Sequence, residues 1–481
     1  MLHKKERLIV SQLRNFIDSD HEYSIALVAG IRRTGKTTML KQLQRYYPDA
    51  IYIDLSAAEN SQEKIEESFL DNPTSLLLLD EISHLKDYEQ YAQMIYNLSS
   101  GEHNRKYKAI MTGSSAAHVI KLSSTKLGGG RARLFRLPLL TFVEYLYFTN
   151  RILSYSDYDH VQAEDFADYL FLDGFESNLS IHFSDNYFRT FYDEVEISNR
   201  TSYLSHSITK LEENDLSNMA NLLAYRLSEA CSYDTTVRPD VGGQEHIHLY
   251  NLGVKSRRSG VDLSDAFISE SVSEAFKVSA SDKGRIIRFL LYAGLANIEH
   301  RHIDSTTPGI ETGRVLSLLS ECSKESELRE LFESISICMS SPLFYTRLGA
   351  DILVRRNVNS GLLRKGMLFG KMLELYIRGG LANWSKKSTI LSSHKLSYDE
   401  LGEIAIWDST TSLLCEVSSG NKDAHKINVC SYFKDTPFIR ICTTRDKEHF
   451  NKIYHQIPFA KLCCMSDTGD IFNLEKTTIE K

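Results

Sequence analysis

The sequence predicts an α/β protein whose N-terminal region forms a parallel β-sheet with helices on both faces. Two observations predict this fold class. Over residues 1–150, short apolar runs alternate with amphipathic stretches, which is the pattern of parallel strands joined by crossover helices. The run at residues 76–79 consists of four leucines, as expected of a strand buried on both faces.

The elements of this region follow from the spacing of their apolar residues. Residues 8–18 carry apolar side chains three and four positions apart, which predicts a helix. A second helix is predicted to begin at Thr37 and to end before Pro48, since proline cannot continue a helix. The predicted strands are residues 24–29, 51–55, 76–79, 109–112 and 133–137, and the predicted helices are residues 8–18, 37–47, 62–70 and 88–98.

The rest of the chain is predicted to form two further regions. The middle region is mainly helical, and the last region returns to a mixed pattern of helix and strand. The predicted elements are helices over 166–172, 219–227, 284–295 and 368–377, polar loops over 232–260, and strands over 404–407, 413–417 and 438–441. We therefore expect three domains, at 1–150, 151–325 and 326–481, which suits a chain of 481 residues.

Composition excludes several classes of protein. The chain is 42% hydrophobic and 25% charged, and its net charge of −7 gives no overall attraction to nucleic acid or to an anionic membrane. Only local basic clusters, at 255–258 and 355–364, offer contacts to DNA phosphates. No apolar run is long enough to span a membrane, and the apolar run near Met1 is too short for a secretion signal. The eight cysteines include no C-x-x-C pair, so we expect a protein of the reducing cytoplasm.

A phosphate-binding loop is predicted between the strand at 24–29 and the helix that follows it. Residues 30–37, read as G-I-R-R-T-G-K-T, fit the pattern G-x-x-x-x-G-K-[ST] in the strand–loop–helix context that this pattern requires. The two glycines allow successive N–H groups to point at one centre, and the helix adds the positive end of its dipole. The residues expected to bind ATP are Gly30, Ile31, Arg32, Arg33, Thr34, Gly35, Lys36, Thr37 and Thr38.

Within this loop the residues have different expected roles. Lys36 is expected to reach the β- and γ-phosphates of ATP, and the Thr37 hydroxyl to bind Mg²⁺. Arg32 and Arg33 occupy variable positions of the pattern and are expected to face solvent or the helices that follow the core.

Two carboxylates follow the leucine strand. Asp80 and Glu81 lie just beyond residues 76–79, where ligands bind in open α/β sheets. Asp80 is expected to hold Mg²⁺ through its water shell, and Glu81 to orient and activate the attacking water. Having both carboxylates favours hydrolysis of ATP over binding alone.

Three further residues are candidates for contacts to the γ-phosphate. Ser114 follows the strand at 109–112, where a polar side chain is placed to bond the γ-phosphate or the attacking water. Arg131 and Arg133 follow three glycines and are candidates for an arginine that acts in cis or on a neighbouring subunit. The alternative for these arginines is that they are solvated side chains beside a strand.

Together these motifs resemble a prokaryotic family of AAA+-like ATPases, the "archaeal ATPase" type. The resemblance covers roughly residues 1–200, and its most specific part is the stretch L-P-L-L-T-F-V-E-Y-L at 137–146. The other matching segments are residues 30–38, 77–82, 111–116, 130–133, 166–170 and 174–175. The resemblance implies a P-loop NTPase core followed by a helical lid and winged helix, and then a C-terminal α/β domain with the fold of restriction-type nucleases.

The resemblance also assigns positions in the later domains. Residues 282–298 are similar to the final helix and turn of a winged helix. In the nuclease-like domain, Glu403 and Glu416 stand at matching places, but Ala405 replaces the metal-binding Asp and Ser418 replaces the Lys. These departures imply an inactive nuclease fold, although Asp399 and Glu400 leave a replacement ligand open.

Three functions are consistent with these predictions. The first is an ATP-hydrolysing switch or motor that acts on DNA or on a protein partner. The second is a nucleotide-gated sensor, for example in stress or phage-defence signalling, in which hydrolysis resets a binding module. The third is an ATP-dependent nuclease, which Ala405 and Ser418 disfavour. The oligomeric state stays open.

Overall fold

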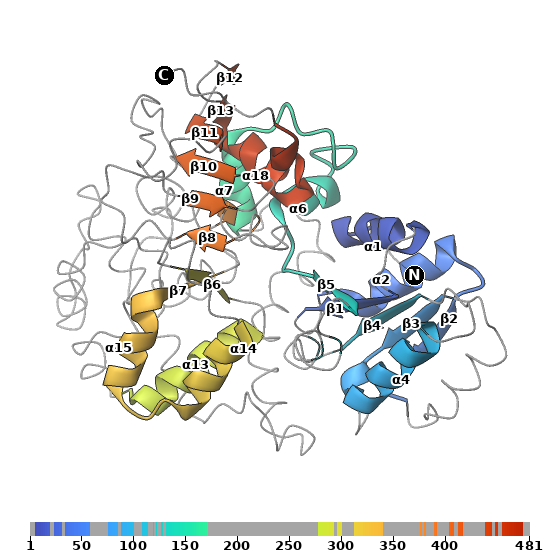
Figure 1. Ribbon diagram of the computed structural model, residues 1–481. Helices are drawn as coiled ribbons and strands as arrows, with labels where there is room; N and C mark the ends of the chain where they lie inside the picture. Colours follow the sequence, from blue (N-terminus) through green and yellow to red (C-terminus); the bar gives the residue numbers. More distant parts are fainter. Residues whose placement is uncertain are drawn as a thin grey trace, which may run out of the picture. The chain divides into compact units, whose positions relative to one another are not determined.

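A computed structural model describes the parts of the chain drawn as ribbon in Figure 1. The described residues are 5–19, 24–30, 34–57, 76–84, 88–100, 108–113, 119, 122, 127, 131–171, 278–292, 296–300, 312–339, 373, 376–377, 380, 389–391, 404–407, 412–416, 438–444, 448–450 and 455–474. The helices predicted over 62–70 and 219–227, the loops over 232–260 and both basic clusters lie outside them. Within the described residues, no helix is both long and apolar enough to cross a bilayer.

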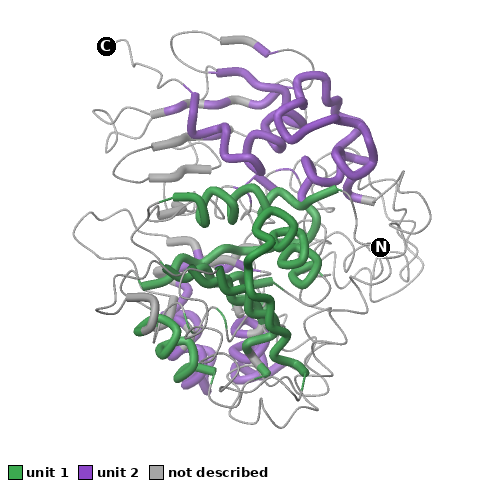
Figure 2. The backbone as a smooth tube through the Cα atoms, turned by 90° about the vertical axis from the view of Figure 1, so that its right-hand side faces the viewer, with its two compact units in different colours: residues 1–140, 185–210, 289–294 green, residues 141–184, 211–288, 295–481 purple. Residues whose placement is uncertain are grey.

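The chain divides into two compact units, which Figure 2 shows in different colours. Unit 1 comprises residues 1–140, 185–210 and 289–294, and unit 2 comprises residues 141–184, 211–288 and 295–481.

Unit 1 contains a five-stranded parallel sheet, as the alternating pattern predicts. Its strands are β1 (Ile25–Ala29), β2 (Ile51–Asp54), β3 (Leu77–Asp80), β4 (Ala109–Thr112) and β5 (Ala132–Arg136). They lie in the order β2-β3-β4-β1-β5, and every pairing is parallel. All five strands therefore end at the same edge, where ligands of open α/β sheets bind. Strand β4 lies between β1 and β3, so it separates the phosphate loop from Asp80.

Helices cover both faces of this sheet (Figure 1). Helices α1 (Leu8–Asp18) and α2 (Lys36–Tyr46) share one hydrophobic core with Ala26 and Val28 of β1. Helix α4 (Tyr88–Ser100) and the short 3₁₀ helix η1 (Ile82–His84) share the other with Ile25 and Leu27. Because successive side chains of a strand point to opposite faces, β1 contributes to both cores and all five of its residues are buried.

Unit 2 contains an eight-stranded sheet. Its order is β12-β13-β11-β10-β9-β8-β6-β7. The strands are β6 (Ala296–His300), β7 (Ile335–Met339), β8 (Thr389–Leu391), β9 (Ile404–Trp407), β10 (Ser412–Glu416), β11 (Phe438–Thr444), β12 (His449–Phe450) and β13 (His455–Pro458). Strand β6, which comes from the middle of the sequence, pairs with β7 and also with β8.

The prediction of a helix and turn over 282–298 is wrong at its C-terminal end. Helix α13 (Ala280–Tyr292) covers the first part, but residues 296–298 belong to strand β6. Two more helices follow, α14 (Thr312–Glu321) and α15 (Glu325–Ser334). The buried ammonium of Lys283 on α13 lies 2.8 Å from a carboxylate oxygen of Glu325 and so joins α13 to α15.

Unit 2 also builds a helical layer from segments far apart in the sequence. Helix α6 (Phe142–Phe148) packs with α7 (Ala163–Phe171) and with α18 (Phe459–Thr468). Their aromatic rings meet mostly edge to face, with 5.3 Å between the centroids of Phe142 and Phe166. The rings of this cluster belong to Phe142, Tyr145, Phe166, Tyr169, Tyr376 and Phe459.

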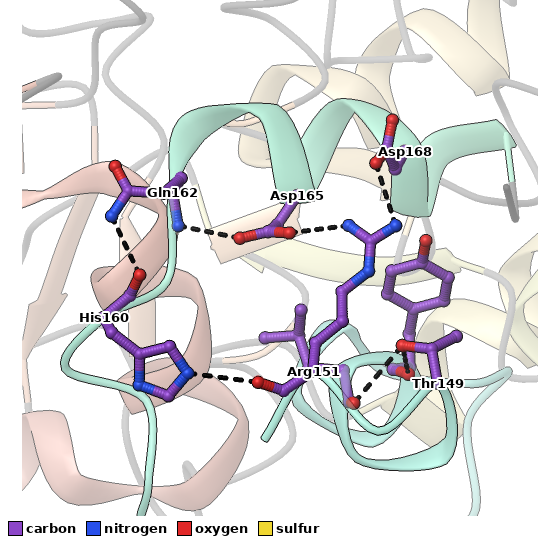
Figure 3. Close-up of polar contacts among 8 residues, drawn as sticks. Thr149, Arg151, His160, Gln162, Asp165 and Asp168 are labelled. Carbon is purple, nitrogen blue, oxygen red and sulfur yellow. Dashed lines mark hydrogen bonds and ion pairs between the residues drawn. The ribbon is translucent and has the colours of Figure 1, made fainter. Parts of the chain in front are cut away.

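Arg151 joins α6 to α7 by a forked ion pair, which Figure 3 shows. Its guanidinium lies 2.6 Å from a carboxylate oxygen of Asp165 and 2.9 Å from one of Asp168. The other oxygen of Asp165 accepts a hydrogen bond from the backbone N–H of Gln162 at the start of α7. One carboxylate thus caps a helix and orients the arginine as well.

The N-terminus of α6 is held by a buried polar network. The Thr141 side chain and Glu144 form a capping box, which satisfies two backbone N–H groups. The next donors find partners elsewhere in unit 2: the N–H of Val143 donates to Asp467 of α18 (3.0 Å), and the N–H of Phe142 donates to the hydroxyl of Tyr376. The Tyr376 hydroxyl donates to Asp467 at 2.7 Å. All these donors and acceptors would be costly to leave unpaired in the interior.

Asp467→Asn is expected to flatten the pH dependence of stability. Burial raises the pKa of Asp467 to about 8, against the opposing hydrogen bonds from Val143 and Tyr376. This folded-state pKa lies above the unfolded value of about 4, so the stabilisation is complete below about pH 4 and is lost as the pH rises toward 8. Unfolding midpoints at pH 5, 7 and 8.5 should fall more for the parent than for Asp467→Asn.

A neighbouring aspartate provides the control for this prediction. Asp470 also accepts a hydrogen bond in this layer, from the Tyr158 hydroxyl, but it lies nearer the surface. Asp470→Asn should keep the parental pH profile because Asp467 is still present. Parallel profiles for the parent and Asp467→Asn would show that Asp467 does not carry the effect.

Candidate nucleotide-binding site

Two glycines shape the loop between β1 and α2. Gly35 has a φ of 96°, in the left-handed region that favours glycine, and it is the N-cap residue of α2. A Cβ on Gly30 would lie 2.7 Å from the carbonyl oxygen of Leu137, so the backbones approach too closely for any side chain. Both positions of the predicted motif therefore require glycine: a side chain would clash with the backbone at Gly30 and would strain the backbone at Gly35. Ile31, Arg32 and Arg33 lie outside the described residues.

The N-terminus of α2 carries the polar residues of the motif. Lys36 is 5% exposed, and its ammonium donates a hydrogen bond to the carbonyl oxygen of Gly30 (2.8 Å). Thr34 is buried, Thr38 is half-buried and Thr37 is exposed. A helix leaves its first N–H groups without intrahelical partners, and glycine at the N-cap has no side chain to satisfy them. This geometry suits an anion.

Asp80 is fixed at the end of β3 by hydroxyl groups from both neighbouring strands. Thr112 of β4 donates to one carboxylate oxygen at 2.5 Å, and Tyr52 of β2 donates to the other at 3.0 Å. Asp80 is 1% exposed. Burial, followed by the charge of Asp80, raises the pKa of the Tyr52 hydroxyl above its ordinary value, so this group stays a donor. Two hydrogen bonds thus orient the carboxylate.

Glu81 has an unusual backbone. Its φ is 61°, a left-handed conformation that costs a residue with a side chain about 1–2 kcal/mol. Its N–H donates to the Thr112 hydroxyl at 3.4 Å, and its partly exposed carboxylate lies 3.9 Å from Nε2 of His84. Strained residues of this kind cluster at functional sites, where the surrounding structure holds them in place.

Sequence reasoning missed Tyr52 and Thr112. Thr112 ends β4, the strand for which the sequence analysis placed the polar contact at Ser114. Ser114 itself lies outside the described residues. The available signal was that Thr112 is a polar residue at the end of an apolar run, but its partner depends on β4 lying beside β3. Tyr52 gives no such signal, because its hydroxyl reaches Asp80 from the neighbouring strand, and the sequence does not show that β2 and β3 pair.

The structure turns the two candidate arginines toward other groups. The exposed Arg131 donates to the side chain of Gln93 on α4 at 3.4 Å, and its guanidinium lies 5.3 Å from the ring centroid of Tyr96. Arg133 lies over the ring of Phe135, at 4.7 Å. Both of these contacts of Arg131 are therefore with α4.

The residues present suit a magnesium ion. A carboxylate and a hydroxyl are oxygen ligands of the kind that Mg²⁺ takes, together with waters and substrate phosphates. Asp80 is held in one orientation by Tyr52 and Thr112, and Thr37 stands exposed in the first turn of α2. These two residues fit the hydroxyl and the carboxylate that hold Mg²⁺ in P-loop NTPases.

Of the residues in the predicted nuclease pattern, the structure describes Ala405 and Glu416. Ala405 lies in β9, opposite Leu391 of β8 and Leu414 of β10, and an alanine offers no metal ligand. Glu416 ends β10 and is paired in register with Cys442. Glu403, Ser418, Asp399 and Glu400 lie outside the described residues.

Comparison with known solved structures gives matches of low sequence identity. The chain is similar to the ADP form of the ORC2 protein of Aeropyrum pernix, at 10% identity and a TM-score of 0.29, over 69% of this chain and 96% of that one. It is also similar to AMPPCP-bound DnaA from Aquifex aeolicus, at 14% identity and a TM-score of 0.26, over 61% and 89% of the two chains.

A family model gives a more local result. Residues 22–146 match a family described as an AAA domain. Comparison with curated proteins gives no match. The matched residues contain the five parallel strands, the loop around Gly35 and the two carboxylates at the end of β3, Asp80 and Glu81. Unit 1 therefore contains a P-loop NTPase core, and residues 22–146 are similar to AAA domains.

Proposed function

We propose that the protein binds ATP with Mg²⁺ at the edge of the unit 1 sheet and hydrolyses it, and that it works as a molecular switch or motor. The observation that carries the proposal is the pairing of a glycine-shaped loop holding Lys36 with a carboxylate, Asp80, fixed by two hydroxyls. The loop and α2 suit the phosphates, and Asp80 with Thr37 suits the metal.

The residues divide the chemistry between them. Lys36 would exchange its hydrogen bond to Gly30 for the phosphates when ATP enters. Mg²⁺, when bound by Thr37 and Asp80, would neutralise charge on the β- and γ-phosphates. Glu81 supplies a carboxylate beside this site, which can orient a water and accept its proton. Thr112 contacts both Asp80 and the N–H of Glu81, so it couples the positions of the two carboxylates.

The proposed partner is DNA or another protein. The alternative is a nucleotide-gated sensor in stress or phage-defence signalling that does no work on DNA. An ATP-dependent nuclease is less well supported because Ala405 supplies no ligand. We propose the three domains as 1–150, 151–325 and 326–481, with the last as an inactive nuclease-like domain and a winged helix before it.

One set of assays tests these proposals. We expect the full chain to release phosphate from ATP in the presence of Mg²⁺. This release should stop when EDTA removes the metal. Turnover that rises with duplex DNA would support action on DNA, whereas turnover indifferent to DNA would favour the sensor. Plasmid cleavage under the same conditions, lost in Glu416→Ala, would revive the nuclease. A chain that neither binds nor hydrolyses ATP would refute the central proposal.

A further inference from the structure

Arg7 occupies a position that is unfavourable for a cation. It is the N-cap residue of α1, where the positive end of the helix dipole disfavours positive charge, and it makes no side-chain cap to that helix. It is also 7% exposed, so its charge is largely removed from water. A buried guanidinium at this end of a helix is costly, and its contacts show what offsets that cost.

The guanidinium of Arg7 reaches the phosphate loop. Nη1 donates a hydrogen bond of 2.9 Å to the carbonyl oxygen of Thr34, within the loop motif. The C=O and N–H of a trans peptide point in opposite directions. By holding the Thr34 carbonyl, Arg7 therefore turns the N–H of Gly35 away from itself, and the left-handed conformation of Gly35 turns the chain into α2.

The other nitrogen of Arg7 ties the loop to the backbone after β5. Nη2 donates to the carbonyl oxygens of Pro138 (3.0 Å) and Leu139 (3.4 Å). The same segment meets the start of the loop, because the Leu137 N–H donates to Ala29 and the Leu137 carbonyl packs against Gly30. Both ends of the phosphate loop are therefore held on residues 137–139, one by packing and the other through Arg7.

We propose that Arg7 is a positioning residue for the nucleotide phosphates: its forked hydrogen bonds to Thr34, Pro138 and Leu139 set the loop in its phosphate-binding conformation before ATP arrives. This inference rests on the proposed nucleotide site. Arg7 acts through the loop backbone, and its positive charge adds to the potential of the site. The planar fork of arginine places donors on two separate nitrogens, Nη1 for Thr34 and Nη2 for Pro138 and Leu139, whereas a lysine would have to reach both segments from a single nitrogen.

Lys108 provides a matched control. Its ammonium also donates to three backbone carbonyls, those of Phe16, Ile17 and Ser19, but it does so at the C-terminal end of α1. Both cations thus anchor the ends of one helix through carbonyls. Of these two cations, only Arg7 contacts the phosphate loop. Substituting either residue should therefore lower the stability of the fold, but only substituting Arg7 should also weaken ATP binding.

The test compares Arg7→Lys, Arg7→Met and Lys108→Met in the full chain, with dissociation constants for MgATP and unfolding midpoints measured on each. Arg7→Lys is expected to weaken ATP binding about tenfold, and Arg7→Met more, because charge is lost as well as the fork. At saturating ATP, kcat should stay near the parental value. Lys108→Met should lower the unfolding midpoint while ATP affinity stays within about twofold of the parent.

Each outcome of this test either supports or overturns the positioning role of Arg7. Parental affinity in Arg7→Lys and Arg7→Met, or an equal loss in Lys108→Met, would overturn the positioning role while leaving the nucleotide site intact. If Arg7→Met does not fold, Arg7→Lys keeps the charge and carries the test. If the parent chain itself binds no ATP, the proposed function fails and this inference fails with it.

Discussion

Glu81→Gln is expected to retain ATP binding and to reduce ATP turnover by about 100-fold or more, the usual contribution of a positioned general base. The amide keeps the size and hydrogen-bonding reach of the side chain but cannot accept a proton from water. The backbone at φ 61° carries the same cost for glutamine as for glutamate, so the unfolding midpoint should not change. Single-turnover phosphate release and ATP affinity, measured on the same preparation, check both parts of the expectation.

His84 supplies the control for this experiment. It lies beside Glu81 and ends η1 but has no assigned role in the reaction. His84→Ala removes the contact with the Glu81 carboxylate and should leave turnover within a few-fold of the parent. Hydrolysis by Glu81→Gln at the parental rate would show that another group activates the water.

Lys36→Ala is expected to weaken nucleotide binding by about 100-fold or more. Hydrogen bonds between a cation and phosphate are among the strongest in proteins, and this ammonium is already desolvated at 5% exposure. Its hydrogen bond to the Gly30 carbonyl also joins the two ends of the loop, so alanine removes the phosphate contact and loosens the loop. Titration with a fluorescent ATP analogue in Mg²⁺ measures the change.

Another lysine of the same helix separates this effect from loss of charge. Lys41 is exposed on α2, with its ammonium 5.8 Å from the ring centroid of Tyr52. Lys41→Ala removes one positive charge from α2 without touching the loop and should bind the analogue like the parent. Equal weakening in the two variants would mean that net charge, and not the position of Lys36, governs binding.

The sequence was sufficient to predict the unit 1 fold because its strands carry strong local signals. Continuous apolar runs marked β1, β3 and β4, and the glycines and Lys36 marked the loop between β1 and α2. The strand order could not be read in this way, since β4 pairs with β1 across more than eighty residues. The contacts of Arg7 and Thr112 depend on that order, so they emerge only in the folded chain.

The later regions were harder to predict because their strands are short and their partners distant. Residues 296–300 follow α13 closely and contain only two apolar residues, Ala296 and Ile298, so the sequence predicted a turn after the helix and no strand there. They form a strand because β7 and β8 lie on either side of them, and both come much later in the chain. Tertiary pairing overrides local preference at such segments.

The capping of α6 by Asp467 has a consequence for biosynthesis. The two residues that meet, Val143 and Asp467, are separated by 324 positions. At a translation rate of about 5–20 residues per second, α6 leaves the ribosome on the order of half a minute before α18. During that interval two rings of α7 lack their late partners: Tyr376 contacts both Phe166 and Tyr169, and Phe459 contacts Phe166. The nascent chain therefore carries a partly uncovered aromatic surface on α7, just after its P-loop core, until α18 has been made.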